Sequence, residues 1–471
     1  SKKCKEKLMQ QKKFTGKVYC KKGQTIHVKI KRLGINGEGI GYYKKKIIFI
    51  PGALPKEFVK AKITESNRNY AKAKLLEIVE KSSQRVDPAD HYDVGGIELE
   101  HLNYDAQLDF KRDVILQALE KFKPRGYEKI ELRKTIGMAD PYHYRNKAAF
   151  QVRMTKTGKL IAGLYKPESH HLVDLPTFET QRKLTLEIIR KTLALMEKWH
   201  VCAYDERTNK GTVKTLVVRE AFATNEAQLV FVTNERFIAH ASEIAAELRN
   251  EFPQLVSVMQ NYNPGKTSLV YGDETTRIFG RDYIIEKLGD VSFKLSARAF
   301  FQMNPIQTRK MYDEVKQALN LKQGEILVDA YCGVGTIGLY CGKEAGLVLG
   351  MDVVSEAIAD AKENAAMSGI KNVVYEEGDA KKIFAKWEKA GQKFDALVVD
   401  PPRTGLDDET IEVILRNKPK KFVYVSCNPS TLARDLVSLV SKYDVSYIQP
   451  IDMFPQTART EAVVKLDLRS E

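Results

Sequence analysis

The sequence predicts an α/β protein with three parts: a small N-terminal β-barrel, an α+β central region and a C-terminal doubly wound sheet. From Met311 onward, apolar strand-like runs alternate with helix-like segments, the pattern of a parallel sheet covered by helices on both faces. Between Thr25 and Glu80, short alternating strands are separated by glycine-containing corners, which is typical of a small barrel. A chain of 471 residues is too long for one hydrophobic core, so several domains are expected.

The positive charge of the chain is concentrated in its N-terminal fifth. Residues 1–86 contain 23 Lys/Arg and 6 Asp/Glu, so they carry 23 − 6 = +17, whereas the whole chain carries +15. The rest of the chain is therefore slightly acidic, at 15 − 17 = −2. We interpret the basic region as a grip on a polyanion, because clustered Lys and Arg create a field that attracts one. A solvated basic tail that keeps the chain soluble is the alternative.

The elements before the C-terminal sheet follow from local patterns. The barrel strands are expected at 25–31, 47–50, 58–63 and 70–79, with a glycine-rich turn at Gly34, Gly37, Gly39 and Gly41. Residues 87–99 are expected to form a linker, and residues 105–122 carry apolar side chains at helical spacing. Residues 130–300 mix strands and helices without a nucleotide-binding signature.

A glycine loop follows the first strand of the predicted parallel sheet. The apolar run Ile326–Ala330 leads into Tyr331-Cys332-Gly333-Val334-Gly335, where glycines let the backbone approach a ligand closely. The next strand, 347–351, leads to Asp352, at the spacing where an acid binds ribose hydroxyls. Asp379, after the following strand, is either a partner for an adenine amino group or a plain helix cap.

The fourth strand distinguishes between two cofactors that share such a loop. It ends in Asp400-Pro401-Pro402-Arg403, and this combination points to S-adenosylmethionine rather than a nicotinamide. Methyltransferases that act on exocyclic amines carry Tyr, Phe or Trp after the two prolines. Because Arg403 stands there, nitrogen methylation is disfavoured.

Cys427 stands at the carboxyl end of a further apolar strand, just before Asn-Pro turns the chain into a helix. Open α/β sheets hold their chemistry at this edge. Asp400 ends an earlier strand, and Glu461 opens the last strand of the chain. A lone cysteine in such a place is often a small buried core residue. The two carboxylates at strand ends of the same sheet favour a catalytic thiol.

Other features argue against several classes of protein. No apolar run reaches the roughly 18 residues of a membrane span, and the basic N-terminus lacks the apolar core of a signal peptide. The six cysteines show no paired spacing, so neither a disulfide framework nor a zinc site is indicated. We therefore expect a cytoplasmic protein with no membrane contact and no metal site.

Five motifs occur in order and resemble those of the bacterial RNA uracil-5-methyltransferases. They are Phe300-Phe301-Gln302-x-Asn304, Asp329-x-Tyr331-Cys332-Gly333-x-Gly335, Asp400-Pro-Pro-Arg403-x-Gly405, Ser426-Cys427-Asn428, and Asp452-Met-Phe-Pro455-Gln456-Thr457 followed by Glu461. The N-terminal barrel is similar to the TRAM domain, an OB-like barrel, of the branch that acts on 23S ribosomal RNA. The resemblance implies a TRAM barrel at 14–80, a central RNA-binding domain at 81–99 and 131–299, and a Rossmann-like class I methyltransferase domain at 100–130 and 300–471.

The resemblance also implies a role for individual residues. Cys427 falls on the nucleophile that adds to uracil C6, and Glu461 on the base that removes the C5 proton. Asp400 is expected to hydrogen-bond the uracil edge, and the helix after Cys427 to stabilise a thiolate through its N-terminus. The residues expected to bind S-adenosylmethionine or to line its pocket are Gln302, Tyr331, Gly333, Gly335, Asp352, Asp379 and Asp400.

Two departures from the family pattern stand out. Relatives with an iron–sulfur cluster carry four cysteines where this chain has Pro88, Val94, Ile97 and Phe178, so no cluster is expected. Many relatives carry histidine two residues before the base. Here that residue is Arg459, which puts a histidine-assisted proton relay in doubt. The cluster-free pattern is similar to the Gram-positive branch, some of whose members methylate two uridines in 23S RNA.

The implied substrate is a uridine of 23S ribosomal RNA, flipped out of a single-stranded loop, at one or two sites. The stretch Tyr144-Arg145-Asn146-Lys147 is expected to hold RNA together with the barrel, with Arg145 and Lys147 as the contacts. For Arg145 a structural ion pair is the alternative. Transfer RNA is the alternative substrate, and a non-catalytic RNA chaperone on a methyltransferase fold is the alternative function. The chain is expected to be a monomer.

Overall fold

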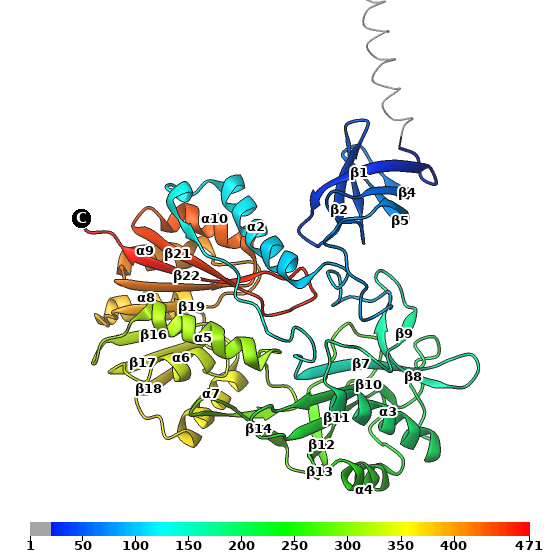
Figure 1. The fold of residues 1–471 in the computed structure, drawn as a ribbon. Coiled ribbons are helices and arrows are strands. Elements are labelled where there is room, and N and C mark those ends of the chain that lie inside the picture. The colour runs from blue at the N-terminus through cyan, green and yellow to red at the C-terminus, as the bar shows by residue number, and fades with distance from the viewer. Residues whose placement is uncertain (1–19) are drawn as a thin grey trace, which may run out of the picture. The chain divides into compact units, whose positions relative to one another are not determined.

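The computed structural model describes residues 20–471 (Figure 1). The expected start of the barrel at residue 14 and the basic segment before it lie outside the described residues. The described chain divides into two compact units. The first contains residues 20–91, 96–111 and 456–459, and the second contains residues 92–95, 112–455 and 460–471. No helix within residues 20–471 is long and apolar enough to cross a membrane.

The first unit contains a closed barrel of five strands in the order β1-β2-β3-β5-β4. The strands are β1 (Thr25–Leu33), β2 (Gly39–Tyr43), β3 (Lys46–Ile50), β4 (Phe58–Ser66) and β5 (Tyr70–Glu80). Along β1 the buried residues Ile26, Val28 and Ile30 alternate with exposed ones, because successive side chains point to opposite faces of a strand. The prediction of a small barrel is confirmed.

The structure corrects one part of the barrel prediction. Gly39 and Gly41, which we expected in a turn, lie in strand β2. A Cβ atom at Gly39 would stand 2.7 Å from the carbonyl oxygen of Ala53, and one at Gly41 2.7 Å from that of Lys29. Neighbouring backbone passes too close for any side chain, which is a reason for glycine inside a strand.

The central region, in the second unit, is built on a seven-stranded sheet in the order β13-β12-β11-β10-β7-β8-β9. Its strands are β7 (Lys147–Met154), β8 (Leu160–Tyr165), β9 (Leu172–Asp174), β10 (Val213–Glu220), β11 (Ala227–Thr233), β12 (Leu255–Tyr262) and β13 (Glu274–Gly280). Helices α3 (Lys183–Lys198) and α4 (Ala241–Glu251) pack on it. A hairpin of β14 (Tyr283–Leu288) and β15 (Val291–Ser296) follows. The mixed character expected for residues 130–300 is confirmed.

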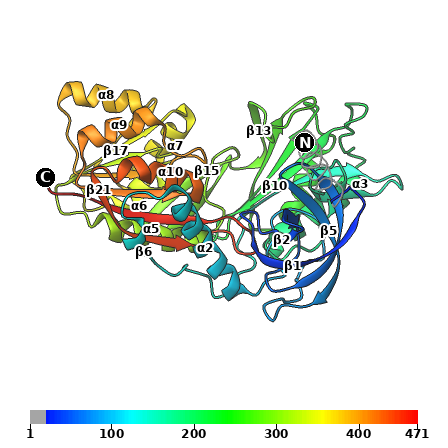
Figure 2. The ribbon, with the colours of Figure 1, turned by 90° about the horizontal axis from the view of Figure 1, so that it is seen from above.

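The C-terminal part contains an eight-stranded sheet in the order β18-β17-β16-β19-β20-β22-β21-β6 (Figures 1 and 2). The strands are β6 (Glu131–Leu132), β16 (Ile326–Ala330), β17 (Leu347–Asp352), β18 (Val373–Glu377), β19 (Ala396–Val399), β20 (Lys421–Ser426), β21 (Tyr443–Ile451) and β22 (Glu461–Leu468). Strands β16 to β20 pair in parallel, whereas β22 runs antiparallel to both β20 and β21. The predicted α/β fold is confirmed, and its last strand is reversed.

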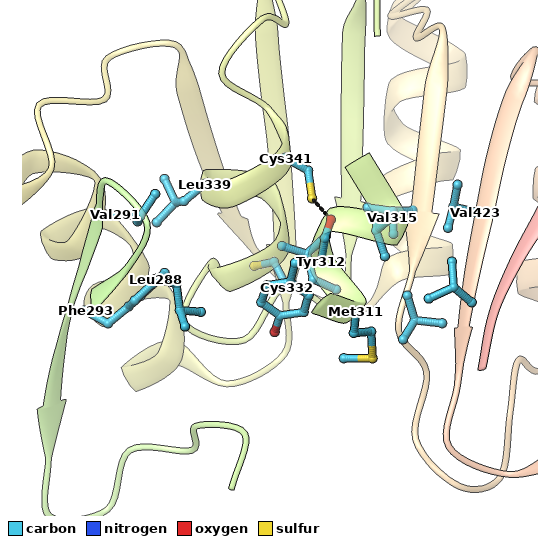
Figure 3. Close-up of a cluster of buried hydrophobic side chains, with 14 of the residues drawn as sticks. Leu288, Val291, Phe293, Met311, Tyr312, Val315, Cys332, Leu339, Cys341 and Val423 are labelled. Atoms are coloured by element: carbon cyan, nitrogen blue, oxygen red, sulfur yellow. Dashed lines mark hydrogen bonds between the residues drawn. The ribbon is translucent and has the colours of Figure 1, made fainter. Parts of the chain in front are cut away.

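Helices cover both faces of this sheet. They are α2 (Tyr104–Phe122), α5 (Pro305–Leu319), α6 (Thr336–Cys341), α7 (Ser355–Met367), α8 (Ala380–Ala390), α9 (Asp408–Asn417) and α10 (Pro429–Leu439). The helix expected at 105–122 is thus confirmed as α2. Successive side chains of β19 point to opposite faces of the sheet, so they belong to two separate cores. Val398 packs in the core that contains residues of α5, α6 and α7, and Leu397 packs in the core that contains residues of α8, α9 and α10. Figure 3 shows the first of these cores around Tyr312.

Candidate active site

The predicted catalytic side chains come together at one edge of the eight-stranded sheet. Strand β19 ends immediately before Asp400, and β20 ends immediately before Cys427. Strand β22 runs the other way and begins with Glu461, and its register pairs Ala462 with Ser426. Glu461 therefore lies across from the position that Cys427 occupies. We call Asp400, Cys427 and Glu461 the reactive edge.

The thiol of Cys427 is less acidic than the sequence led us to expect. Burial, together with the charges of Glu461 and Asp400, raises its pKa to about 11, and the charge of Arg403 acts in the opposite direction. The first free N–H group of α10 is already used, because the Asn428 side chain accepts a hydrogen bond from Ser430 N at 3.1 Å. The expectation of a stabilised thiolate is wrong for this geometry, since two carboxylates and burial outweigh one guanidinium.

Cys427 nevertheless differs from the other cysteines in its surroundings. Among residues 20–471, Cys20, Cys332 and Cys341 are buried, Cys202 is exposed, and Cys427 is half-buried. Cys341 donates to the carbonyl oxygen of Tyr312 at 3.4 Å inside the core drawn in Figure 3, and Cys332 lies in the same core. Burial raises the pKa of both core thiols. Cys427 is the described cysteine that combines partial exposure with nearby carboxylates.

Asp400, in the reactive edge, and the nearby Asp329 both have raised pKa values. Withdrawal from water raises the pKa of Asp400 to about 7. Asp329, in β16, also has its pKa raised to about 7 by burial, with the charges of Asp400 and Asp352 adding to the effect. One oxygen of Asp329 accepts a hydrogen bond from Gly338 N at 2.9 Å, and the other is buried without a partner. A buried carboxylate oxygen without a partner suits a cationic ligand.

The glycine loop combines a tight turn with open space. Gly333 N donates to Asp352 at 3.0 Å, which ties the loop to the end of β17. Gly335 has φ of 86° at the start of α6, where a Cβ atom would stand 2.6 Å from the hydroxyl of Tyr375. A Cβ atom at Gly333 would meet nothing within 4 Å, so the backbone there leaves room for a ligand.

Tyr331 and Asp379 are engaged by the protein itself. The Tyr331 side chain packs against the core of α8, α9 and α10, and burial raises its pKa to about 12. Asp379 caps helix α8 by accepting a hydrogen bond from Lys381 N at 3.0 Å. The helix-cap alternative for Asp379 is therefore what its side chain does here.

These features fit S-adenosylmethionine, which carries a ribose and a positively charged sulfur. Asp352 ends the second strand where an acid binds ribose hydroxyls, and Gly333 leaves space beside it. The acid-rich surroundings of Asp329 and Asp400 favour a cation.

Residues 103–469 match the tRNA (uracil-5-)-methyltransferase family, and residues 20–76 match the TRAM domain. The chain belongs to this family. It is an S-adenosylmethionine-dependent RNA (uracil-5-)-methyltransferase.

Relatives of the methyltransferase match over nearly its whole length. An uncharacterized RNA methyltransferase of Lactiplantibacillus plantarum is 54% identical, over 95% of this chain and 93% of the relative. One from Enterococcus faecalis is 50% identical, over 95% of this chain and 98% of the relative. The solved structure of the Pyrococcus abyssi tRNA (uracil-54, C5)-methyltransferase in complex with S-adenosyl-L-homocysteine is 28% identical. It superposes with a TM-score of 0.77, over 94% of this chain and 100% of that one.

The segment before α5, which carries Gln302, is held by the central part of the methyltransferase. Asn146 donates through its side chain to the carbonyl oxygen of Gln302 at 2.9 Å and through its backbone N–H to that of Met303 at 2.9 Å. Arg145 contacts the sulfur of Met303 at 3.5 Å and lies 5.9 Å from the ring centre of Phe454. Arg145 therefore contacts the loops around the reactive edge, and no acid is its partner among residues 20–471.

Sequence reasoning missed the residues that tie these loops together. Asn304 caps α5 by accepting a hydrogen bond from Gln307 N at 3.2 Å, and its amide donates to the carbonyl oxygen of Met453 at 3.1 Å. Tyr144 donates to the carbonyl oxygen of Pro455 at 2.8 Å. Asn304 stands in one of the five motifs, so its position was a signal that we did not interpret.

Where the family resemblance led us to compare cluster cysteines, this chain has Pro88, Val94, Ile97 and Phe178. Val94 and Phe178, which replace two of those cysteines, are buried apolar side chains. Across residues 20–471, no group of three or more His, Cys, Asp or Glu side chains is placed to hold a metal ion. That the protein lacks an iron–sulfur cluster stays a prediction.

Proposed function

We propose that this methyltransferase modifies C5 of uridine in 23S ribosomal RNA, through a covalent bond between Cys427 and uracil C6. The observation that carries the proposal is the reactive edge, where a thiol lies between two carboxylates at strand ends of one sheet. Uracil C5 is a poor nucleophile until a nucleophile adds at C6. Intact Cys427 and Glu461 argue against the non-catalytic chaperone.

In the first step the Cys427 thiol loses its proton and its sulfur forms a bond to C6. The C5–C6 π electrons move toward the C4 carbonyl oxygen, which makes an enolate that is nucleophilic at C5. Because the pKa of Cys427 is about 11, substrate binding has to assist this deprotonation. A carboxyl with a pKa of about 7, such as Asp400, is a competent acceptor for the proton at neutral pH.

S-adenosylmethionine, when bound, supplies the methyl group to C5. Asp352 would hold its ribose, and the buried carboxylates of Asp329 and Asp400 favour its positive charge. Gln302, Tyr331, Gly333, Gly335 and Asp379 are the further candidates for contact with it. Glu461 then removes the C5 proton, and the electron pair of that bond restores the C5–C6 double bond and expels the Cys427 thiolate. The residue two positions before Glu461 is Arg459 and not a histidine, so the Glu461 carboxylate removes the proton without help from an imidazole.

The chemistry is argued from the reactive edge, whereas the choice of RNA is argued from the barrel and the family pattern. The basic barrel was expected to favour 23S RNA, because transfer RNA relatives typically lack it. The solved Pyrococcus abyssi enzyme, a tRNA methyltransferase by its title, covers 94% of this chain, which favours transfer RNA as the second candidate. We keep 23S RNA as the proposal because of the cluster-free family pattern, and propose the three-domain division expected above with it.

Mapping 5-methyluridine in RNA from a deletion strain tests this choice. We expect one or two uridines of 23S RNA to lose the methyl group while transfer RNA keeps its own. Purified protein incubated with S-adenosylmethionine should restore the mark on 23S RNA from that strain. If only transfer RNA loses the methyl group, transfer RNA is the substrate, and the proposed chemistry at C5 still holds.

A further inference from the structure

Lys147 is a half-buried cation that faces other cations. It begins strand β7, and the register with β10 places it directly opposite Arg219. Burial, with the charges of Arg219 and Arg145, lowers the pKa of Lys147 to about 8. In the part of the chain that the structure describes, no carboxylate pairs with Lys147, Arg145 or Arg219. Three positive side chains thus gather without a counter-charge.

Two neighbours give this cluster a defined shape. Arg219 is buried, and its guanidinium donates to the carbonyl oxygen of Ala299 at 2.7 Å. Tyr271 and Ala149 both pack against the apolar cluster that contains Val217. Val217 and Ala149 lie two residues from Arg219 and Lys147 and share their face of the sheet. The hydroxyl of Tyr271 is buried without a hydrogen-bond partner, within electrostatic reach of Arg219. The sheet face therefore offers a hydroxyl donor next to the cations.

The start of β7 adjoins the segment before α5 that carries Gln302. Asn146, the residue before Lys147, holds the carbonyl oxygens of Gln302 and Met303 at 2.9 Å. Arg145 touches the sulfur of Met303. An RNA strand that places a base near Gln302 would therefore bring its backbone close to Lys147.

We propose that Lys147, Arg145, Arg219 and the Tyr271 hydroxyl form a pocket for one backbone phosphate of the RNA strand that carries the target uridine. We call it the cationic pocket, and it rests on the proposed function in that RNA is the substrate. A phosphodiester brings the single negative charge that these cations lack, together with acceptor oxygens for the ammonium and the hydroxyl. The pocket would position the strand and carry no sequence information.

The stability of a Lys147 variant distinguishes a phosphate-binding role of this lysine from a purely structural one. The folded protein holds the pKa of Lys147 below its unfolded value, so keeping this side chain charged opposes folding below about pH 8. That penalty is relieved as the pH rises above about 8, where the folded form releases the proton. Replacing Lys147 by Gln should therefore leave the melting temperature at pH 7 unchanged or higher, whereas a structural lysine would lower it.

The test uses the full chain with Lys147→Gln, Lys147→Arg and Tyr271→Phe, and with Lys156→Gln as the matched control. Lys156 is an exposed lysine in the turn after β7. Affinity for a synthetic single-stranded RNA is measured over a range of salt. We expect Lys147→Gln to lower the log–log salt slope by roughly 0.7, the value for one phosphate contact on a single strand. Lys147→Arg should keep the slope, Lys156→Gln should change little, and Tyr271→Phe should weaken binding roughly tenfold at constant slope.

Inorganic phosphate separates the two sources of the ligand. If phosphate raises the melting temperature of the wild type but not of Lys147→Gln, and the RNA salt slopes agree, the pocket takes free phosphate and the proposal is overturned. It is equally overturned if folded Lys147→Gln binds RNA with the wild-type slope. None of these readouts needs turnover, so a failure of the pocket is distinguishable from a failure of the methylation chemistry.

Discussion

The reactive edge and the cationic pocket treat charge in opposite ways. At the reactive edge, burial and neighbouring carboxylates raise the pKa of Cys427 to about 11, and burial raises that of Asp400 to about 7. At the cationic pocket, burial and neighbouring arginines lower the pKa of Lys147 to about 8. At neutral pH the raised pKa of Asp400 and the lowered pKa of Lys147 each oppose folding. Such costs are typical of groups arranged for a ligand of the opposite character. The comparison predicts that substitutions at the edge affect chemistry, whereas substitutions in the pocket affect affinity.

The largest effect is expected from Cys427→Ala. RNA with 5-fluorouridine at the target should trap the wild type in a complex that survives denaturation, because fluorine cannot leave as a proton would. Without the thiol, both trapping and methyl transfer should be abolished, while RNA affinity and its salt slope stay at the wild-type values. Denaturing gel shift and tritium transfer measure the two. Cys202→Ser, at an exposed cysteine, is the control that should keep both activities. Methylation by the Cys427 variant would remove the nucleophile assignment.

Glu461→Gln should separate the base from the nucleophile. The substitution keeps the shape of the side chain and loses the carboxylate, so addition and methyl transfer should proceed and elimination should stall. We expect a methylated protein–RNA adduct to accumulate, visible by mass spectrometry, and turnover to fall by at least about 100-fold, as for loss of a general base. Glu344→Gln, at an exposed glutamate, serves as control. Wild-type release of tritium from 5-tritiated uridine would show that another group takes the proton.

Two neighbours of Cys427 should shift its pKa in opposite directions. Asp400→Asn removes a negative charge and should lower the thiol pKa from about 11, whereas Arg403→Met removes the opposing positive charge and should raise it. A shift of one unit changes the thiolate fraction about tenfold at a pH below the pKa. The rate of Cys427 alkylation at pH 8, followed by peptide mass spectrometry in a Cys202→Ser background, should rise about tenfold in the first variant and fall in the second. Shifts in the same direction would contradict the charge arrangement.

The two regions differ in how far the sequence predicted them. The reactive edge was predictable, because Asp400 and Cys427 directly follow apolar runs and the carboxyl ends of parallel strands meet at one edge. The pKa of Cys427 was not, because it depends on how many charges surround the sulfur in space. The cationic pocket was predictable only in part. Lys147 was a candidate RNA contact, but its pairing with Arg219 depends on a strand register between residues far apart in the sequence.

For the barrel, the sequence predicted the strands and the basic charge. It did not predict which residues contact one another once the barrel has closed. Gly39 and Gly41 were recognised as unusual positions and assigned to a turn, since their close contacts with Ala53 and Lys29 exist only after the barrel closes. Its basic residues, by contrast, follow directly from strand alternation, because the buried positions are apolar and the exposed ones are largely charged.

The smallest effect on the chemistry is expected from the outer face of the barrel. Lys62 and Lys74 lie directly opposite each other on β4 and β5, and both are exposed. Like charges at such a position destabilise strand pairing, so the pair is costly unless a polyanion offsets it. The double variant Lys62→Gln/Lys74→Gln should lower the salt slope of RNA binding by roughly 1.4, two contacts of about 0.7 each, and weaken affinity modestly.

The barrel variant also sharpens the comparison with the cationic pocket. Its affinity for S-adenosylmethionine and its trapping by 5-fluorouridine RNA at saturation should equal those of the wild type, because both belong to the reactive edge. Lys389→Gln/Lys393→Gln, two exposed lysines at and after the end of α8, controls for net charge. If the barrel variant and this control give the same slope, the basic region acts as the solubility element considered above. Lys147 and its neighbours would then be the main RNA contacts. The decrease in salt slope caused by Lys147→Gln should in that case be a larger fraction of the total salt slope of RNA binding.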